Sequence, residues 1–208
     1  MRWAGRGALG RLAMNLASWF APPYFARRAL ARFHPRGYIA PTATLYHRHF
    51  TSGAHVFLGD RTLLYQDHQG GPIRLGDRVH LYGEDCLQTG AGGSIDIASD
   101  THIQPRCQFS AYRGSIHIGS NVQIAPNCAF YAYAHEVKAG QIIREQPLVS
   151  KGGITIGDDV WLGCNVIVLD GAVIGSGAVI GAGAVVSGNI PPGAIAVGVP
   201  ARVVKYRT

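Results

Sequence analysis

Along most of this chain an apolar residue returns every six positions. A six-residue period fits neither the 3.6-residue turn of an α-helix nor the two-residue alternation of a half-buried strand. It fits a solenoid in which each hexad forms one flat side, three hexads make a triangular coil of about 18 residues, and coils stack about 4.8 Å apart. The recurring positions are Leu58, Leu64, Leu75, Leu81, Leu87, Ile97, Ile103, Phe109, Ile118, Ile124, Phe130, Ile156, Leu162, Val168, Ile174, Ile180 and Val186.

A second set of positions follows the first set four residues later and holds mostly small or β-branched side chains. We expect both sets to point into the coil and the other positions to point outward. This arrangement is typical of the left-handed parallel β-helix, an exception to the right-handed rule for crossover connections. The second set comprises Thr62, Val79, Thr101, Val122, Cys128, Val160, Val166, Ala172, Ala178 and Ala184.

The hexads also predict how the whole chain is organised. We expect an all-β fold, a triangular hexapeptide-repeat solenoid, over residues 38–191. Residues 1–37 should form a helical N-terminal segment, and residues 192–208 a tail that packs on the coil. At 208 residues the chain is long enough to bury a real core in one such domain.

The repeat breaks once for about twenty residues. After Phe130 the next hexad should begin at residue 136, but the next apolar residue in phase is Ile156, so residues 136–155 are expected to protrude as a loop. In this phase Ala134 points inward and His135 points outward beneath the loop. Long insertions in a regular scaffold tend to carry function, and imidazole can take and return a proton near neutral pH. His135 is therefore a candidate general base, with a surface histidine or a loop anchor as the alternatives.

The positive charge of the chain is concentrated at its start. Eight of the 19 basic residues and none of the 12 acidic residues lie in residues 1–59, which leaves 11 basic and 12 acidic residues in the rest. A nucleic-acid-binding coil would carry its cations along a groove or face, so we expect no nucleic-acid partner. Residues 1–36 combine arginines with Leu9, Leu12, Leu16, Trp19 and Phe20 at roughly helical spacing.

Two interpretations of this basic segment remain open. An acid-free amphipathic helix can lie on an anionic membrane surface. Alternatively it packs on the coil with its arginines in water. The segment is too short and interrupted, by Pro22 and Pro23, to span a bilayer, and it lacks a clear signal-peptide cleavage site. The expected location is cytoplasmic, with the inner face of the membrane as the place of any such contact.

The four cysteines fit the repeat better than a metal site or a disulfide. Cys107 and Cys128 occupy inward positions one coil apart, so we expect reduced thiols that stack in the core of a cytoplasmic protein. Cys86 and Cys164 fall at outward or edge positions, and no CxxC pair suggests zinc. We expect no metal.

The C-terminal half resembles the hexapeptide-repeat acyltransferases, which include galactoside, maltose and xenobiotic acetyltransferases and many polysaccharide O-acetyltransferases. The resemblance rests on "HIGSNVQIAPNCAFYAYAHEV", "GGITIGDDVWLGCNVIVLDGAVIGSGAVIGAGAVV" and "VPARVVK", which cover roughly residues 116–205. The order of these motifs is more specific than hexads alone. It implies an enzyme that uses acetyl-CoA as acyl donor and works as a homotrimer with active sites between subunits.

The resemblance also assigns roles to individual residues. His135 would be the catalytic base and the backbone N–H of Cys164 the oxyanion donor. Trp161 would border the pantetheine channel and the backbone at Ala182 would contact the pantetheine arm, although an outward Trp161 could merely cover a corner of the coil. Ser187, Arg202 and Lys205 would bind the nucleotide end of the cofactor, where guanidinium suits phosphate.

Three departures from the family pattern limit what is carried over. Many relatives have Thr-Lys-Asp where this chain has Ser187-Gly188-Asn189, so one cation is missing. The asparagine that contacts the acceptor in galactoside-type enzymes is replaced near Pro105 and Arg106. The N-terminal helical motif of maltose-type enzymes is absent, and a free disaccharide acceptor is not expected.

These patterns are compatible with four functions. The favoured one is acetyl transfer to a sugar hydroxyl in surface polysaccharide or glycolipid biosynthesis, with N-acylation of an amino sugar as the alternative. A non-catalytic structural coil is a further possibility, because a fold does not fix a function. Zinc carbonic anhydrases share the coil but need three converging histidines. His80 and His102, predicted to stack outward in neighbouring coils, have no third partner in the sequence.

Overall fold

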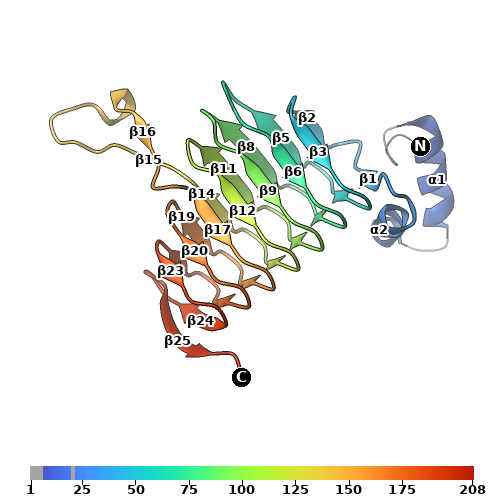
Figure 1. Cartoon of the computed structure of the whole chain (residues 1–208). Coiled ribbons are helices and arrows are strands. Elements are labelled where there is room, and N and C mark those ends of the chain that lie inside the picture. Colours follow the sequence, from blue (N-terminus) through green and yellow to red (C-terminus); the bar gives the residue numbers. More distant parts are fainter. Residues whose placement is uncertain (1–6, 20–21) are drawn as a thin grey trace.

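The chain forms a three-sided parallel β-helix of the predicted left-handed class, with two helices at its N-terminal end (Figure 1). The structure is a computed structural model and describes residues 7–19 and 22–208. Each coil places one strand on each of three sheets, here called face A, face B and face C. All pairings between successive coils are parallel, so each face is a stack of short strands about 4.8 Å apart.

The strands divide among the faces as follows. Face A holds β1 (Tyr38–Ile39), β4 (Phe57–Leu58), β7 (His80–Leu81), β10 (His102–Ile103), β13 (Gln123–Ile124), β18 (Trp161–Leu162), β21 (Val179–Ile180), β24 (Ala194–Val197) and β25 (Arg202–Tyr206). Face B holds β2 (Thr44–Tyr46), β5 (Leu63–Gln66), β8 (Cys86–Gly90), β11 (Gln108–Tyr112), β14 (Ala129–Tyr131), β19 (Ile167–Leu169) and β22 (Val185–Val186). Face C holds β3 (Phe50–Ser52), β6 (Ile73–Leu75), β9 (Ile95–Ile97), β12 (Ile116–Ile118), β17 (Ile154–Ile156), β20 (Val173–Ile174) and β23 (Asn189–Ile190).

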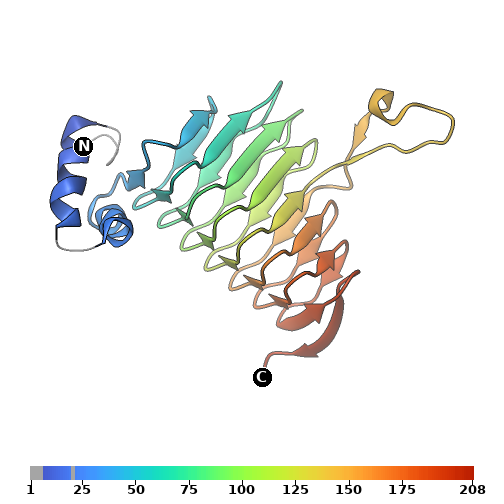
Figure 2. The same ribbon diagram turned by 180° about the vertical axis from the view of Figure 1, so that it is seen from behind.

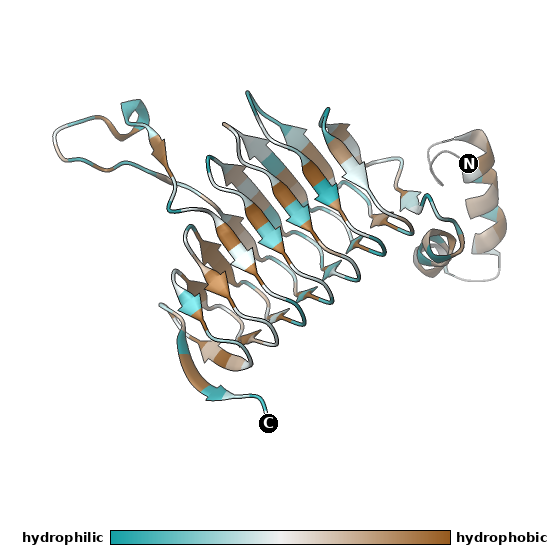
Figure 3. Ribbon diagram, viewed as in Figure 1, coloured by the Kyte–Doolittle hydropathy of each residue, from teal (hydrophilic) through white to brown (hydrophobic). Residues whose placement is uncertain are grey.

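The core is a set of columns in which equivalent residues of successive coils stack. Phe109 lies over Phe130 with ring centroids 4.4 Å apart and planes at 3°. Every one of the seventeen recurring apolar positions is buried, and apolar residues line up from strand to strand along the stack (Figure 3). Cys107 and Cys128 are free and buried, as the repeat predicted.

Tight corners join the faces. At the corner between faces A and B, a Cβ on Gly163 would lie 2.6 Å from the backbone nitrogen of Ala182 in the next coil, so only glycine allows this close approach. Asn127 and Asn165 adopt positive φ at equivalent places on the same corner, a conformation that asparagine tolerates well. The sequence thus fixes the turns as well as the columns.

The two helices sit on the first coils. Helix α2 (Pro23–Phe33) is tied to the coil by an ion pair between Arg27 and Asp60 of 2.7 Å, and Ala31 O lies 3.1 Å from His55 Nδ1. Helix α1 (Ala8–Ser18) packs on α2. None of the helices in the described ranges is long and apolar enough to cross a membrane.

The predicted apolar side of α1 faces away from the coil. Leu9, Leu12, Leu16 and Trp19 are 71%, 55%, 45% and 77% exposed. The smaller face of the helix, with the buried Gly10 and the partly buried Met14, makes the contacts with the rest of the protein. Arg2, Arg6 and Phe20 lie outside the described residues. The four exposed side chains therefore do not rest on the coil, although α1 itself packs on α2.

A long loop leaves the coil between β14 and β17 and projects away from it (Figures 1 and 2). It contains β15 (Ala134–His135), a short 3-10 helix (Ile143–Glu145) and β16 (Leu148–Val149), with β15 antiparallel to β16. The chain has already left the coil after the buried Ala132, so Ala134 is exposed. The prediction that Ala134 points inward was wrong, because pairing within the loop replaces the hexad geometry.

His80 takes an outward position on face A, as predicted, and its side chain is only 3% exposed because α2 and Tyr82 cover this part of the face. His102 lies beside it and is half-buried. The C-terminal residues also differ from a simple tail, since β25 runs antiparallel to β24 and adds a last strand to face A.

Candidate functional site

His135 lies at the base of the projecting loop. It is the last residue of β15 and pairs with Leu148 of β16, while the backbone N–H of Glu136 donates to Pro147 O at 3.1 Å. The side chain is exposed, as the hexad phase predicted, and its ring makes no hydrogen bond to the described part of the chain. The imidazole is therefore held on a paired strand and is accessible to a substrate.

A hollow of about 430 Å³ opens at the foot of this loop. Leu148 and Val149, which pair with His135 and Ala134, form part of its wall. The hollow is lined by Arg113, Leu148, Val149, Ser150 and Gly152. A small acceptor group could enter next to the strand that carries the histidine.

Two buried polar side chains fix the shape of the loop. The Gln146 side-chain carbonyl accepts from Lys138 N at 2.8 Å, and its amide donates to Lys138 O and Gln141 O at 3.1 Å each. Asp170 holds the returning limb by accepting from Ser150 Oγ and Gly153 N at 2.9 Å each. Neither residue stands out in the sequence, because a lone Gln in an insertion and a lone Asp after a strand give no pattern of their own.

The corner between faces A and B carries the predicted backbone donors. Cys164 follows β18, and Ala182 occupies the same place one coil later, where Gly183 N donates to Cys164 O at 2.8 Å. Both residues are exposed, and within the described ranges neither of their backbone N–H groups donates to a backbone carbonyl. Unpaired N–H groups at an exposed corner are suited to bind an oxyanion or an amide carbonyl.

A column on the outer side of face A leads from this corner to the C-terminal cations. Trp161 is 55% exposed and stands in register with Val179, then Ile195, then Lys205. Three strand spacings separate the first residue from the last, which is about 14 Å. Arg202 lies on the same last strand, and its guanidinium donates to Ala201 O at 3.0 Å. An extended ligand with an anionic end fits this column.

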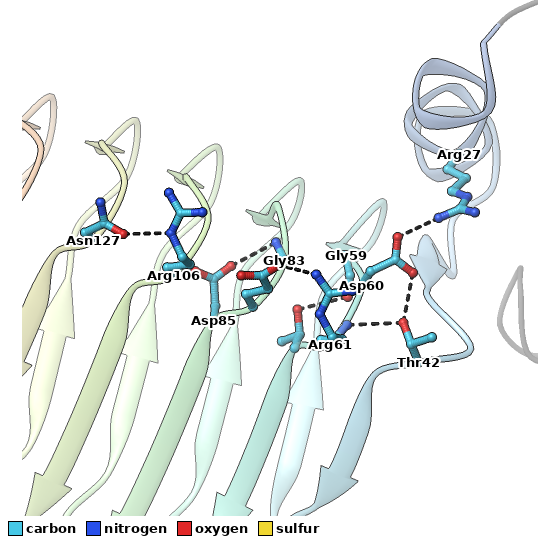
Figure 4. Close-up of polar contacts among 11 residues, drawn as sticks. Arg27, Thr42, Gly59, Asp60, Arg61, Gly83, Asp85, Arg106 and Asn127 are labelled. Atoms are coloured by element: carbon cyan, nitrogen blue, oxygen red, sulfur yellow. Dashed lines mark hydrogen bonds and ion pairs between the residues drawn. The ribbon is translucent and has the colours of Figure 1, made fainter.

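The same corner continues into the N-terminal coils as a chain of polar contacts (Figure 4). Asp60 accepts from Arg27 at 2.7 Å and from Thr42 Oγ1 at 2.8 Å, and Arg61 pairs with Glu84. Two coils before Cys164, the Nε of Arg106 donates to Asn127 Oδ1 at 2.8 Å. Arg106 is one of the two residues near which the family asparagine is replaced, and Asn127 holds its guanidinium at this corner.

The predicted site residues fall into two groups that a single chain does not bring together. Cys164, Ala182 and Trp161 lie at or next to the corner between faces A and B. His135 leaves from the corner between faces B and C, and Ser187 follows β22 at that same second corner. The width of face B and one coil step, from β14 to β19, separate the base from the oxyanion donor.

Comparison with known proteins identifies the repeat region. Residues 153–188 match the family model for the bacterial transferase hexapeptide (six repeats). Galactoside O-acetyltransferase of Escherichia coli K12 is 40% identical over 52 residues, which cover 25% of this chain and 26% of that protein. A putative lipopolysaccharide biosynthesis O-acetyl transferase, WbbJ, of the same strain is 39% identical over 57 residues, or 27% of this chain and 29% of that protein. The matches thus span less than a third of each relative.

Solved structures share the fold over most of the chain. AntD, an N-acyltransferase from Bacillus cereus crystallised as a mutant with dTDP-4-amino-4,6-dideoxyglucose and coenzyme A, superposes with a TM-score of 0.63 at 20% identity, covering 83% of this chain and 81% of that one. The polySia-specific acetyltransferase NeuO gives 0.61 at 20% identity, with coverages of 83% and 80%. The predicted resemblance to hexapeptide-repeat acyltransferases is thereby confirmed for the fold and the repeats.

Proposed function

We propose, from the premise that residues 153–188 are bacterial transferase hexapeptide repeats, that the protein is an acyltransferase. It transfers an acetyl group from acetyl-CoA to a hydroxyl group of a carbohydrate. The observation that carries the proposal is the pair of unpaired backbone N–H groups at Cys164 and Ala182, next to the column from Trp161 to Lys205. The matched O-acetyltransferases support the reaction class.

The residues present provide each part of the reaction. The imidazole of His135 takes the proton of the acceptor hydroxyl as its oxygen attacks the thioester carbonyl carbon. The backbone N–H of Cys164 donates to the oxyanion that forms, where a fixed donor contributes most. The C–S bond then breaks, and the thiolate of coenzyme A leaves with the proton that His135 returns. No acyl-enzyme forms, so the Cys164 thiol has no part in the reaction.

The donor binds along face A in this proposal. Trp161 borders the pantetheine chain, and the N–H of Ala182 contacts one of its amides. Arg202, Lys205 and Ser187 bind the nucleotide end, although Ser187 lies at the other corner of the same chain. Because Gly188 supplies no cation, Arg202 and Lys205 carry the charge for the phosphates.

The two halves of the site meet if three chains assemble around face B. A three-fold assembly with face B inward brings the corner that carries His135 in one chain against the corner that carries Cys164 in the next. The outer side of face B suits an interface, with Leu63, Tyr65, Tyr131, Ile167, Leu169 and Val185 on its surface. Face C suits water, because it carries an ion pair between Arg74 and Asp96 of 2.6 Å. We therefore propose a homotrimer.

The acceptor is proposed to be a sugar unit of a surface polysaccharide or a glycolipid. The similarity to WbbJ, which is described as acting in lipopolysaccharide biosynthesis, and the fold of NeuO support this choice. The fold of AntD keeps N-acylation of an amino sugar as the second candidate. A sugar hydroxyl is favoured because two of the matched relatives, at 40% and 39% identity, are named as O-acetyltransferases.

An assay of thiol release from acetyl-CoA over a panel of sugars, nucleotide sugars and lipid-linked sugars tests the function. The His135→Ala variant should lose at least 100-fold in kcat with its fold intact, because the side chain is exposed and serves only the proton transfer. His117→Ala is the matched control, an exposed histidine on face C. Cys164→Ala should stay within about twofold, because its N–H remains.

Unchanged turnover in His135→Ala would refute the proposed base. Failure of the unaltered protein to release thiol with any acceptor would favour a structural coil. A 100-fold loss in Cys164→Ala would replace the direct transfer by a route through the thiol.

A further inference from the structure

A second pocket lies away from the acyl-transfer site, between α2 and the corner that joins faces C and A. Its volume is about 470 Å³, within the usual range for small-molecule sites. It is lined by Arg32, His55, Arg78, His80, Asp100 and His102. None of these residues takes part in the proposed reaction.

The charge in this pocket is positive. Arg78 donates two hydrogen bonds to Asp100, from Nε to Oδ1 at 2.6 Å and from Nη2 to Oδ2 at 2.7 Å. The charge of Asp100, the only carboxylate that lines the pocket, is therefore already neutralised. Arg32 forms no ion pair with any acidic residue of the described chain. Arg28 stands over the ring of Tyr82 at 5.0 Å and adds a further positive charge next to the two histidines.

The histidines add hydrogen-bond donors without adding charge. The rings of His80 and His102 stack with centroids 4.7 Å apart and planes at 1°, and each Nδ1 lies 3.4 Å from the Tyr82 hydroxyl. Burial, followed by the neighbouring His102 and the arginines of α2, lowers the pKa of His80 to about 4, and burial lowers the pKa of His102. Both rings are therefore neutral at pH 7. The Tyr82 hydroxyl has one proton and can donate it to the Nδ1 of one of the two rings. That neutral ring then carries its own proton on Nε2, which can donate to a ligand.

We propose that this pocket binds the phosphate group of a small phosphorylated molecule. Guanidinium and imidazole N–H groups match the oxygens of phosphate, and an uncompensated positive charge excludes a metal cation. Phosphate alone would fill a small part of 470 Å³, so there is room for an attached group such as a sugar. A sugar phosphate and a phospholipid headgroup share this chemistry.

The pocket also has a defined position relative to the acyl-transfer site. His102 stands in register with Gln123, and Gln123 with Trp161, on the outer side of face A. Two strand spacings, about 10 Å, separate the two ends of this series. The binding proposal does not depend on the proposed reaction, since it is measured without an acyl donor.

Isothermal titration calorimetry at low salt on the full chain tests the proposal, with inorganic phosphate, pyrophosphate and a hexose 1-phosphate as probes. We expect saturable binding of the hexose phosphate, and at least a tenfold higher Kd in Arg32→Gln. Arg74→Gln is the matched control, because Arg74 is an exposed arginine paired with Asp96 on face C. Its Kd should remain within twofold.

A second variant and a competition experiment complete the test. His102→Gln keeps a side-chain donor in the half-buried position and should weaken binding less than Arg32→Gln does. Vesicles containing phosphatidic acid should displace the hexose phosphate if a lipid headgroup is the source, and leave it bound if the source is a soluble ester. Absence of saturable binding of all three probes, or an equal loss in Arg32→Gln and Arg74→Gln, would overturn the proposal.

Discussion

Asp85 places a carboxyl group in a column that other coils fill with Thr62, Cys107 and Cys128. It is fully buried at the corner between faces A and B and accepts a hydrogen bond from Cys107 N at 2.9 Å. A second hydrogen bond comes from Gly83 N at 3.1 Å (Figure 4). Burial raises the pKa of Asp85 to about 7, although the two N–H donors act in the opposite direction. At neutral pH the buried Asp85 carboxyl is partly ionised, and the cost of burying that negative charge lowers the stability of this coil.

The sign of the pH effect follows from this raised pKa. The carboxyl group of the unfolded chain titrates near its model value of 3.8, so the stability that protonated Asp85 contributes is present below that pH and is lost as the pH rises through about 7. Asp85→Asn should remove this dependence, which in the unaltered protein is a fall in the free energy of unfolding of about 2–4 kcal/mol between pH 5 and pH 8, from the size of the shift.

Urea unfolding at pH 5 and pH 8 measures this effect. Glu145→Gln, a carboxyl-to-amide change on the exposed loop, is the control and should alter neither value. An equal fall in the free energy of unfolding from pH 5 to pH 8 in Asp85→Asn and in the unaltered protein would show that another group carries the pH dependence.

At the scale of residues, the sequence predicted positions inside a regular hexad far better than positions at its borders. Phe130 and Cys128 lie inward because each continues a column set by neighbouring coils. Ala134 does not, because the antiparallel pairing with Val149 takes over as soon as the loop begins. His80 turned outward as its phase required, but its burial by α2 depends on a contact over many residues that no local pattern contains.

At the scale of elements, helix α1 leaves its apolar stripe of Leu9, Leu12, Leu16 and Trp19 in water. An exposed amphipathic helix of this kind, with arginines and no acidic residue in residues 1–59, suits the surface of an anionic bilayer. We propose a peripheral membrane contact through residues 1–36, which would place the protein beside a lipid-linked acceptor.

Flotation with anionic vesicles tests this contact. The double change Leu12→Ser and Leu16→Ser should reduce the bound fraction at least fivefold, because it removes the two leucine side chains that would insert into the bilayer surface. Val203→Ser and Val204→Ser in β25, which are also exposed, serve as the matched control. Equal flotation of both variants and the unaltered protein would contradict the proposal.

The loop is the element whose existence the sequence predicted and whose structure it did not. A gap between Phe130 and Ile156 in the hexad series was sufficient to locate the excursion. The pairing of β15 with β16 and the bonds of Gln146 and Asp170 depend on single polar side chains within an irregular segment. Such contacts have no period, so no count along the sequence reveals them.

At the scale of the whole molecule, the placement of His135 and Cys164 on opposite edges of face B argues for the three-chain assembly proposed above. Ile167→Arg, on the outer side of that face, should convert the trimer to a monomer, because three unpaired cations would meet at the axis. Activity should fall with the loss of the trimer, while the coil stays folded. Light scattering coupled to size exclusion measures the mass.

Val173→Arg is the matched control for this change. Val173 is an exposed valine on face C, 45% exposed against 37% for Ile167. It should leave the mass and the activity unchanged. A monomeric mass for the unaltered protein, or a trimer that survives Ile167→Arg, would rule out face B as the interface.

The antiparallel strand β25 has a consequence for the free end of the solenoid. A parallel stack presents at its last coil the same row of N–H and C=O groups that every coil offers to the next, and another chain could add to that row. On face A the row is taken by β25, which reverses direction and leaves no parallel register to copy. At this end of the described coil the sheet edges are β25 on face A and the two-residue β23 on face C, while Val185 of β22 is already paired with Gly198 and Ala201. On face A, therefore, a further copy of the repeat cannot continue the parallel stack, because the strand it would meet runs in the opposite direction.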